Sequence, residues 1–185
     1  MKKTKIGIFL MIAILLSSTM ICLVKATPPT QVSGRLATVP GTTVISNTLK
    51  EGANVFADIY NKGTYLSGDI LGSYEQTYRA VTHFANPDFT IGNPTLQPEA
   101  PFNFMDIERT FTGTVDGVSG GFTMRLQGTG YGNTFLGPTH FDVQGTWVII
   151  SGTGGLADLH GQGTWWHSRT GFAGLEYQGQ IHFDP

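Results

Sequence analysis

Glu75 and Arg79 are the charged residues whose types and spacing come nearest to a chemical site in this sequence. They are four residues apart, so their side chains would share one face of an extended strand. Turned inward, this carboxylate–guanidinium pair would anchor the polar group of a ligand or serve in acid–base catalysis. Turned outward, it would be an ordinary surface ion pair, and the rings of Tyr74 and Tyr78 on the opposite face favour this second interpretation.

Asp106 and Glu108 form a second acidic pair, with Arg109 in the same charged cluster. Paired carboxylates can divide the roles of acid and base between them. However, threonines continue their face at positions 110, 112 and 114, which is typical of a solvated strand surface. We therefore expect this pair to be exposed and without a catalytic role.

The five histidines do not form a recognisable metal-binding pattern. His140, His160 and His182 would share the polar face of the last three predicted strands, but the expected register places no two of them side by side. No HxH or HExxH spacing occurs, so the sequence predicts no metal site and no cofactor. His167 differs, because it shares an apolar face with Trp165, and it would either line the mouth of a barrel with Arg169 or be a satisfied or half-exposed histidine at a turn.

The candidate ligand-binding residues are ionisable and aromatic side chains that could reach such an interior. They are Glu75, Tyr78, Arg79, Trp147, Trp165, His167 and Tyr177. No residue is predicted to be catalytic, because the sequence contains neither a GxSxG nucleophile elbow nor a phosphate-binding loop.

The elements that must position these residues are predicted to be β-strands. Short segments alternate between apolar and polar residues and are separated by glycine and proline turns, which is typical of an all-β sandwich or barrel. Residues 64–84 would form one long strand bent at Gly68 or Gly72. Residues 85–101 contain four prolines and would form the one long loop. The strands are expected near residues 31–38, 42–50, 54–61, 64–84, 102–116, 118–130, 139–150, 156–167 and 172–183.

Three glycines in the last strands are expected to form one row across the apolar face of the sheet: Gly145, Gly161 and Gly179. One explanation is geometric, because such a row lets a sheet bend or admits a bulky neighbour such as Trp147. The other is that the row leaves space for a ligand inside a barrel.

The segment GTWVIISGTGGLADLHGQGTWWHSRTGFAGLEYQGQIHFDP, residues 145–185, resembles a family of uncharacterised bacterial and archaeal proteins whose fold is similar to the allene oxide cyclase barrel. The segments GTYLSGDILGSYEQTYRAV and RTFTGTVDGVSGGFTMRLQGTG are also similar to that family, so the resemblance covers roughly residues 42–185. It implies a closed antiparallel β-barrel of about eight strands with a lipocalin-like outline. It transfers no catalytic residue, and a shared fold does not by itself give a function.

Composition excludes several classes of protein. The chain has 185 residues, of which 40% are apolar and 13% charged, so it is not a disordered chain. A net charge of -2 argues against nucleic acid as a partner. The single cysteine, Cys22, excludes a disulfide scaffold.

Residues 1–26 are predicted to be a signal peptide, with three lysines, an apolar stretch and a Val-Lys-Ala cleavage site. The alternatives are an uncleaved membrane anchor over Ile6–Val24 and, less well supported, a lipid anchor on Cys22. Cleavage after Ala26 would remove four of the 11 basic residues and leave 7 basic against 13 acidic side chains, a net charge of -6. Residues 27–41 would then be a linker with the first strand, and residues 42–185 the barrel domain of a secreted protein without a membrane partner.

Three functions are compatible with such a barrel. The first is the binding of a small, mostly apolar ligand in an aromatic interior, with the 85–101 loop over one mouth. The second is an enzyme of the cyclase or isomerase type, in which the barrel shapes a reactive substrate. The third is a structural or interaction protein with a filled interior. The oligomeric state and the ligand cannot be derived from the sequence.

Overall fold

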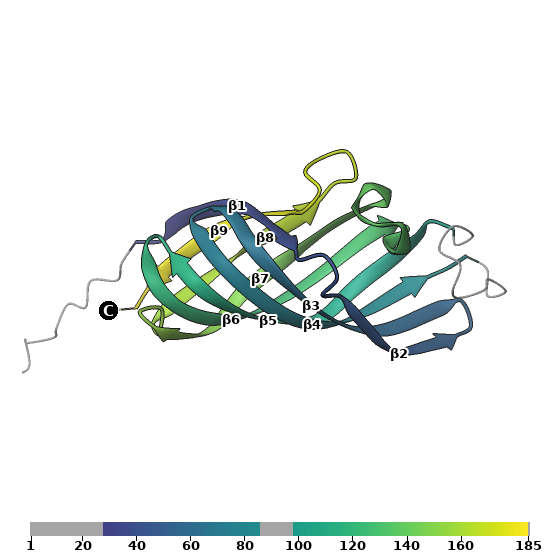
Figure 1. Ribbon diagram of the computed structural model, residues 1–185, viewed down its shortest axis with the longest axis horizontal. Helices are drawn as coiled ribbons and strands as arrows, with labels where there is room; N and C mark the ends of the chain where they lie inside the picture. Colours follow the sequence, from purple (N-terminus) through teal and green to yellow (C-terminus); the bar gives the residue numbers. More distant parts are fainter. Residues whose placement is uncertain (1–27, 86–97, 185) are drawn as a thin grey trace, which may run out of the picture.

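The computed structural model describes residues 28–85 and 98–184, and these residues form β-strands joined by turns and two short 3₁₀ segments (Figure 1). The expected signal peptide and most of the expected 85–101 loop lie outside the described residues. No helix in the described ranges is long and apolar enough to span a membrane. The strands are β1 (Thr30–Thr38), β2 (Val44–Glu51), β3 (Asn54–Gly68), β4 (Ile70–His83), β5 (Ala100–Val115), β6 (Val118–Gly132), β7 (Phe141–Gly154), β8 (Leu159–His167) and β9 (Leu175–Phe183).

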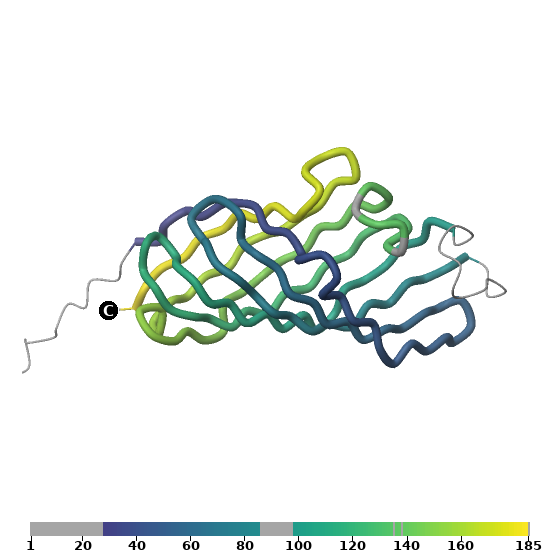
Figure 2. The backbone as a smooth tube through the Cα atoms, viewed as in Figure 1, coloured from purple at the N-terminus to yellow at the C-terminus, as the bar shows by residue number. Residues whose placement is uncertain are grey.

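All strand pairs are antiparallel, and the hydrogen bonding of eight strands runs in a ring. The order is β1-β9-β8-β7-β6-β5-β4-β3, and β1 then pairs with β3 as well as with β9. The strand β2 is the ninth member of the sheet, and it pairs with the first part of β3 along the edge whose last part pairs with β1. Figures 1 and 2 show the strands wrapping around a common interior, with the β3–β4, β5–β6 and β7–β8 hairpins gathered at one end. The predicted all-β fold is confirmed.

The expected single strand over residues 64–84 is wrong, because the chain reverses direction at its start. β3 continues to Gly68, and β4 begins at Ile70. Gly68 has a φ of 99°, a left-handed conformation that favours glycine. The carboxylate of Asp69, in the turn, accepts a hydrogen bond of 2.7 Å from the Ser33 backbone N–H and so connects the turn to β1.

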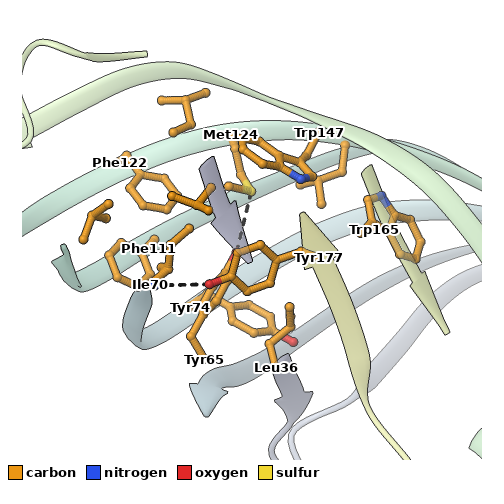
Figure 3. Packing of buried hydrophobic residues seen from close by; sticks show 14 of the residues in the cluster. Leu36, Tyr65, Ile70, Tyr74, Phe111, Phe122, Met124, Trp147, Trp165 and Tyr177 are labelled. Atoms are coloured by element: carbon orange, nitrogen blue, oxygen red, sulfur yellow. Dashed lines mark hydrogen bonds between the residues drawn. The ribbon is translucent and has the colours of Figure 1, made fainter. Parts of the chain in front are cut away.

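One half of the interior is filled with packed aromatic side chains (Figure 3). Tyr65 lies at the centre, with its ring edge-on to Tyr74, Phe111 and Tyr177 at centroid distances of 5.4–5.7 Å. Phe111 also stacks on Phe122 at 4.4 Å. Because edge-on and offset aromatic pairs add to the free energy gained from burial, this cluster is the main stabilising core.

The polar atoms of these buried tyrosines are mostly satisfied. The Tyr177 hydroxyl accepts a hydrogen bond of 3.1 Å from the Ile70 backbone N–H, and the Tyr65 hydroxyl contacts the Met124 sulfur at 3.8 Å (Figure 3). The Tyr74 hydroxyl is buried without a hydrogen-bond partner among the described residues.

The expected glycine row does not exist, because the strands pair in a different register. Gly145 lies opposite Trp165, Gly161 opposite Ile181, and Gly179 opposite Gly163. The expected pairing was displaced by four residues between β7 and β8 and by two between β8 and β9, and shifts by an even number keep every side chain on its own face. The alternation of apolar and polar residues is therefore the same in both registers and does not distinguish them.

Gly145, Gly163 and Gly179 admit tryptophan rings, which is the geometric explanation, whereas Gly161 lies against the Ile181 side chain. A Cβ atom on Gly145 would lie 2.6 Å from the Trp165 indole nitrogen, and one on Gly163 would lie 2.6 Å from the Trp147 ring. Gly179 faces the same Trp147 ring. The space above these glycines is therefore occupied, and the hypothesis that they leave room for a ligand is wrong.

Candidate functional site

The other half of the interior contains a cavity of about 670 Å³. Its wall comes from the ends of β1, β4 and β8 and the beginnings of β3, β5 and β7, whereas the packed cluster lies toward the opposite ends of those strands. β2 contributes Ile45 and Thr48 to the wall, and the 3₁₀ segment Thr134–Leu136 contributes Thr134. The molecule is thus filled at one end of the ring and hollow at the other.

Most of the cavity wall is apolar and aromatic. The rings of Tyr78 and Phe104 meet at 5.1 Å, and Phe141 packs against the imidazole of His167 at 4.9 Å. A wall of this kind favours a ligand with an apolar body. Its smaller apolar members are Val55, Ala57, Ile59, Ala80, Val143 and Leu175.

Arg109, on β5, is the polar centre of the cavity floor. Its side chain is 3% exposed, and its guanidinium lies over the Tyr74 ring at 4.2 Å. Its Nε donates a hydrogen bond of 2.9 Å to the Gln76 side-chain oxygen, and its Nη1 donates one of 3.0 Å to the Tyr65 hydroxyl. These contacts fix the guanidinium between the packed cluster and the cavity.

Asn61, Gln76 and Arg109 form one polar row across three neighbouring strands. Asn61 on β3 pairs with Gln76 on β4, which pairs with Arg109 on β5. All three side chains are buried and line the cavity. The Asn61 side-chain oxygen has no hydrogen-bond partner among the described residues. A buried polar atom without a partner is costly, so this oxygen is available to a hydrogen-bond donor in the cavity.

Tyr78 lies beside this row and is strongly desolvated. Burial raises the pKa of its hydroxyl to about 12, and the neighbouring Tyr74 also raises it, whereas Arg109 and a hydrogen bond with Asn61 act in the opposite direction. Its hydroxyl is therefore neutral near pH 7 and can serve a ligand as a donor or an acceptor.

His167 is buried where β8 ends, and it lines the cavity. Its Nδ1 lies 2.6 Å from the Gly174 backbone oxygen, so the loop between β8 and β9 orients the ring. Both interpretations of His167 describe it in part, because its ring is hydrogen-bonded at the end of a strand and also faces the interior.

The structure brings together only three of the seven candidate ligand-binding residues. Tyr78, Trp165 and His167 line the cavity. Trp147 and Tyr177 belong to the packed cluster in the filled half. The predicted aromatic interior is therefore present, but part of it forms the core.

Glu75 and Arg79 are on the outer surface, so neither can contact a ligand in the cavity. Glu75 is 56% exposed and pairs with Lys62 at 2.6 Å, and hydrogen bonds from Lys62 and Tyr60 lower the pKa of its carboxyl. Arg79 is 53% exposed and pairs with Asp58 at 2.8 Å. The solvent interpretation of this pair is correct, because the aromatic face of β4 is the one that turns inward.

Arg109 is the residue that the sequence reasoning missed, although a signal was present. It alternates with Ile107 and Phe111, both buried, whereas Asp106 and Glu108 are exposed as expected. A β-bulge between Phe104 and Ile107 changes which residues of β5 face inward. The alternation of β5 after this bulge places a charged residue on an otherwise apolar face.

His160 and His182 are neighbours, contrary to the expected register. They are cross-strand partners on β8 and β9, with stacked rings 5.4 Å apart, and their Nε2 atoms lie 3.1 and 3.5 Å from the Asp184 carboxylate. No group of three or more His, Cys, Asp or Glu residues in the described ranges is arranged to hold a metal ion.

No family profile and no curated protein matches this sequence. Among solved structures, the fold is similar to that of a protein of unknown function from the DUF3224 family of Shewanella oneidensis MR-1. The TM-score is 0.56 at 14% sequence identity, over 85% of this chain and 98% of that chain. This likeness concerns the fold alone and is consistent with the expected resemblance to an uncharacterised family. The likeness to allene oxide cyclases stays a prediction.

Proposed function

We propose that this chain is a secreted protein that holds a small, mostly apolar ligand inside a closed β-barrel formed by its ring of eight strands. The observation that carries the proposal is the cavity of about 670 Å³ in the hollow half of the ring. Ligand pockets commonly have volumes of about 300–1,000 Å³.

The composition of the wall supports the same function. Specific small-molecule sites combine many apolar side chains with a few polar groups that fix orientation. Here the aromatic and aliphatic wall surrounds the row of Asn61, Gln76 and Arg109. A purely structural barrel would gain stability by filling this space, as the other half of the ring is filled.

Secretion is part of the proposal because the first 26 residues have the charge, apolar stretch and cleavage site of a signal peptide. Mass determination of the protein recovered outside the cytoplasm of its host tests this part. A chain that begins at Thr27 is the expected result, and a chain that retains residues 1–26 would contradict it.

The binding function is tested with Nile red, a neutral dye that fluoresces in apolar surroundings. The wild-type protein should bind the dye with a saturable increase in fluorescence. Ala80→Trp should abolish that increase, because Ala80 lines the cavity and an indole there would occupy it. The matched control is Thr77→Trp on the exposed face of the same strand, which should bind as the wild type does.

Native mass spectrometry of protein purified from its own host should in addition reveal a bound small molecule. If neither this experiment nor the dye detects an occupant of the cavity, or if Ala80→Trp and Thr77→Trp bind the dye equally, the proposed function is wrong.

A further inference from the structure

We propose that the ligand of this cavity is an anionic amphiphile, a carboxylate with an apolar body, whose carboxylate binds Arg109. This inference rests on the proposed function, because it names the chemical class of the ligand that would occupy the same cavity. It is carried by the charge, the contacts and the position of one buried side chain.

No acidic side chain among the described residues forms an ion pair with Arg109. None of the ion pairs among the described residues includes Arg109, although its side chain is 3% exposed. The guanidinium group stays charged in proteins. Buried charges are normally paired, because an unpaired one loses its hydration without compensation. The missing counterion is therefore expected to come from the ligand.

The contacts of Arg109 hold it in place without neutralising it. Tyr65, Tyr74 and Gln76 all interact with the guanidinium, and all three are uncharged. The hydrogen bonds use Nε and Nη1, and the remaining N–H groups of the guanidinium have no hydrogen-bond partner within residues 28–85 and 98–184. An arginine held in this way presents donors that match the two oxygens of a carboxylate.

The described lining of the cavity carries a positive charge. Among its described lining residues, Arg109 is the only Lys, Arg, Asp or Glu. A single cation at the floor of an apolar cavity attracts anions and disfavours cations, because the low dielectric of the wall strengthens its field. The apolar wall toward the rim, with Phe104 and Phe141, suits the body of the same ligand.

The unpartnered oxygen of Asn61 is a second observation that points to a ligand in this place. It belongs to the same row as Arg109, two strands away, so the two side chains are separated by about 10 Å across the sheet. A hydroxyl group on the apolar body, or a water molecule bound with the ligand, would donate to this oxygen. At one end of the polar row Arg109 would bind an anion, and at the other end Asn61 would accept a hydrogen bond from the ligand.

The test compares two ligands that share an alkyl chain and differ in charge. Decanoate and 1-decanol compete with bound Nile red at pH 7. Decanoate should displace the dye from the wild-type protein at a concentration at least about tenfold lower than 1-decanol, since charge-assisted hydrogen bonds are clearly stronger than neutral ones. Equal competition would overturn the proposal and leave the proposed function intact.

Two variants assign the preference to Arg109. Arg109→Met removes the charge, and the ratio between the two competitors should fall to about one. Gln76→Glu keeps the arginine and its geometry but places a carboxylate at 2.9 Å from Nε, so an internal counterion should abolish the preference for decanoate. The second variant decides the question if the first does not fold.

The matched control is Arg79→Met, which removes an arginine from the outer surface of the neighbouring strand and should keep the wild-type ratio. A preference for decanoate that survives both Arg109→Met and Gln76→Glu would show that the carboxylate binds elsewhere. A protein that binds neither the dye nor either competitor would instead refute the proposed function itself.

Discussion

Glycines in this fold make room for aromatic rings, and Gly128 shows the effect in a simple form. A Cβ atom at this buried position would lie 2.5 Å from the Trp165 ring. We expect Gly128→Ala to lower the free energy of unfolding by about 1–3 kcal/mol, because the ring cannot move without disturbing its packed neighbours. Urea unfolding of the variant and the wild type measures this difference.

Gly171→Ala is the control for that experiment. A Cβ atom there would lie 3.4 Å or more from its nearest neighbours, which is an ordinary contact. The double variant Gly128→Ala with Trp165→Phe should cost less than the sum of the two single variants, since the smaller ring leaves room for the methyl group. Additive costs would contradict this account of Gly128.

At the scale of the element, β2 is the strand that depends least on the rest of the molecule. Each of its eight residues is exposed, and it pairs with β3 alone. Its backbone amides should exchange with deuterium about a hundredfold faster than those of β5, which has strands on both sides. Mass spectrometry of peptides from the two strands checks this, and equal protection would contradict it.

The strand boundaries and the register show which features of the fold the sequence pattern can predict. Alternation and turn residues place most strand boundaries of β5–β9 within about three residues, because inward and outward positions differ in polarity throughout. The sequence does not distinguish a reversal at Gly68 from a bend, since glycine is compatible with both and only the pairing of β3 with β4 decides between them. The register between β8 and β9 is ambiguous in the sequence too, because a shift of two residues leaves the alternation of apolar and polar side chains unchanged.

The candidate site was predictable only in part. Tyr78, Trp165 and His167 could be placed on the interior face from alternation, and they line the cavity. Whether an interior aromatic residue packs, as Trp147 does, or faces empty space depends on neighbours from distant strands. Arg109 could have been found by the rule that a charge between buried apolar positions needs a reason.

At the scale of the whole molecule, buried tyrosines connect stability to alkaline pH. Burial raises the pKa of Tyr78 to about 12 and also raises the pKa values of Tyr65 and Tyr177. A raised pKa in the folded state gives stability that is present below pH 10 and is lost as pH rises toward the folded value. The free energy of unfolding should therefore fall between pH 10 and 12, on the order of 1.4 kcal/mol per pH unit for each such tyrosine.

Urea unfolding at pH 8, 10 and 11 measures this loss. Tyr78→Phe removes one of these hydroxyl groups, so the free energy of unfolding should fall less steeply with pH than in the wild type. A free energy of unfolding that stays constant from pH 8 to pH 11 would show that these hydroxyls ionise as freely in the folded protein as in the unfolded chain.

The position of β1 in the ring has a consequence for how the protein is made. β1 bonds to β3 on one side and to β9 on the other, so the first and last strands in the sequence are neighbours. The seam between them can form only after the ribosome has completed the final strand, and contacts of such long sequence separation slow folding. A chain still under synthesis therefore lacks this seam, and the secretion proposed above would require the chain to cross the membrane in this unclosed form.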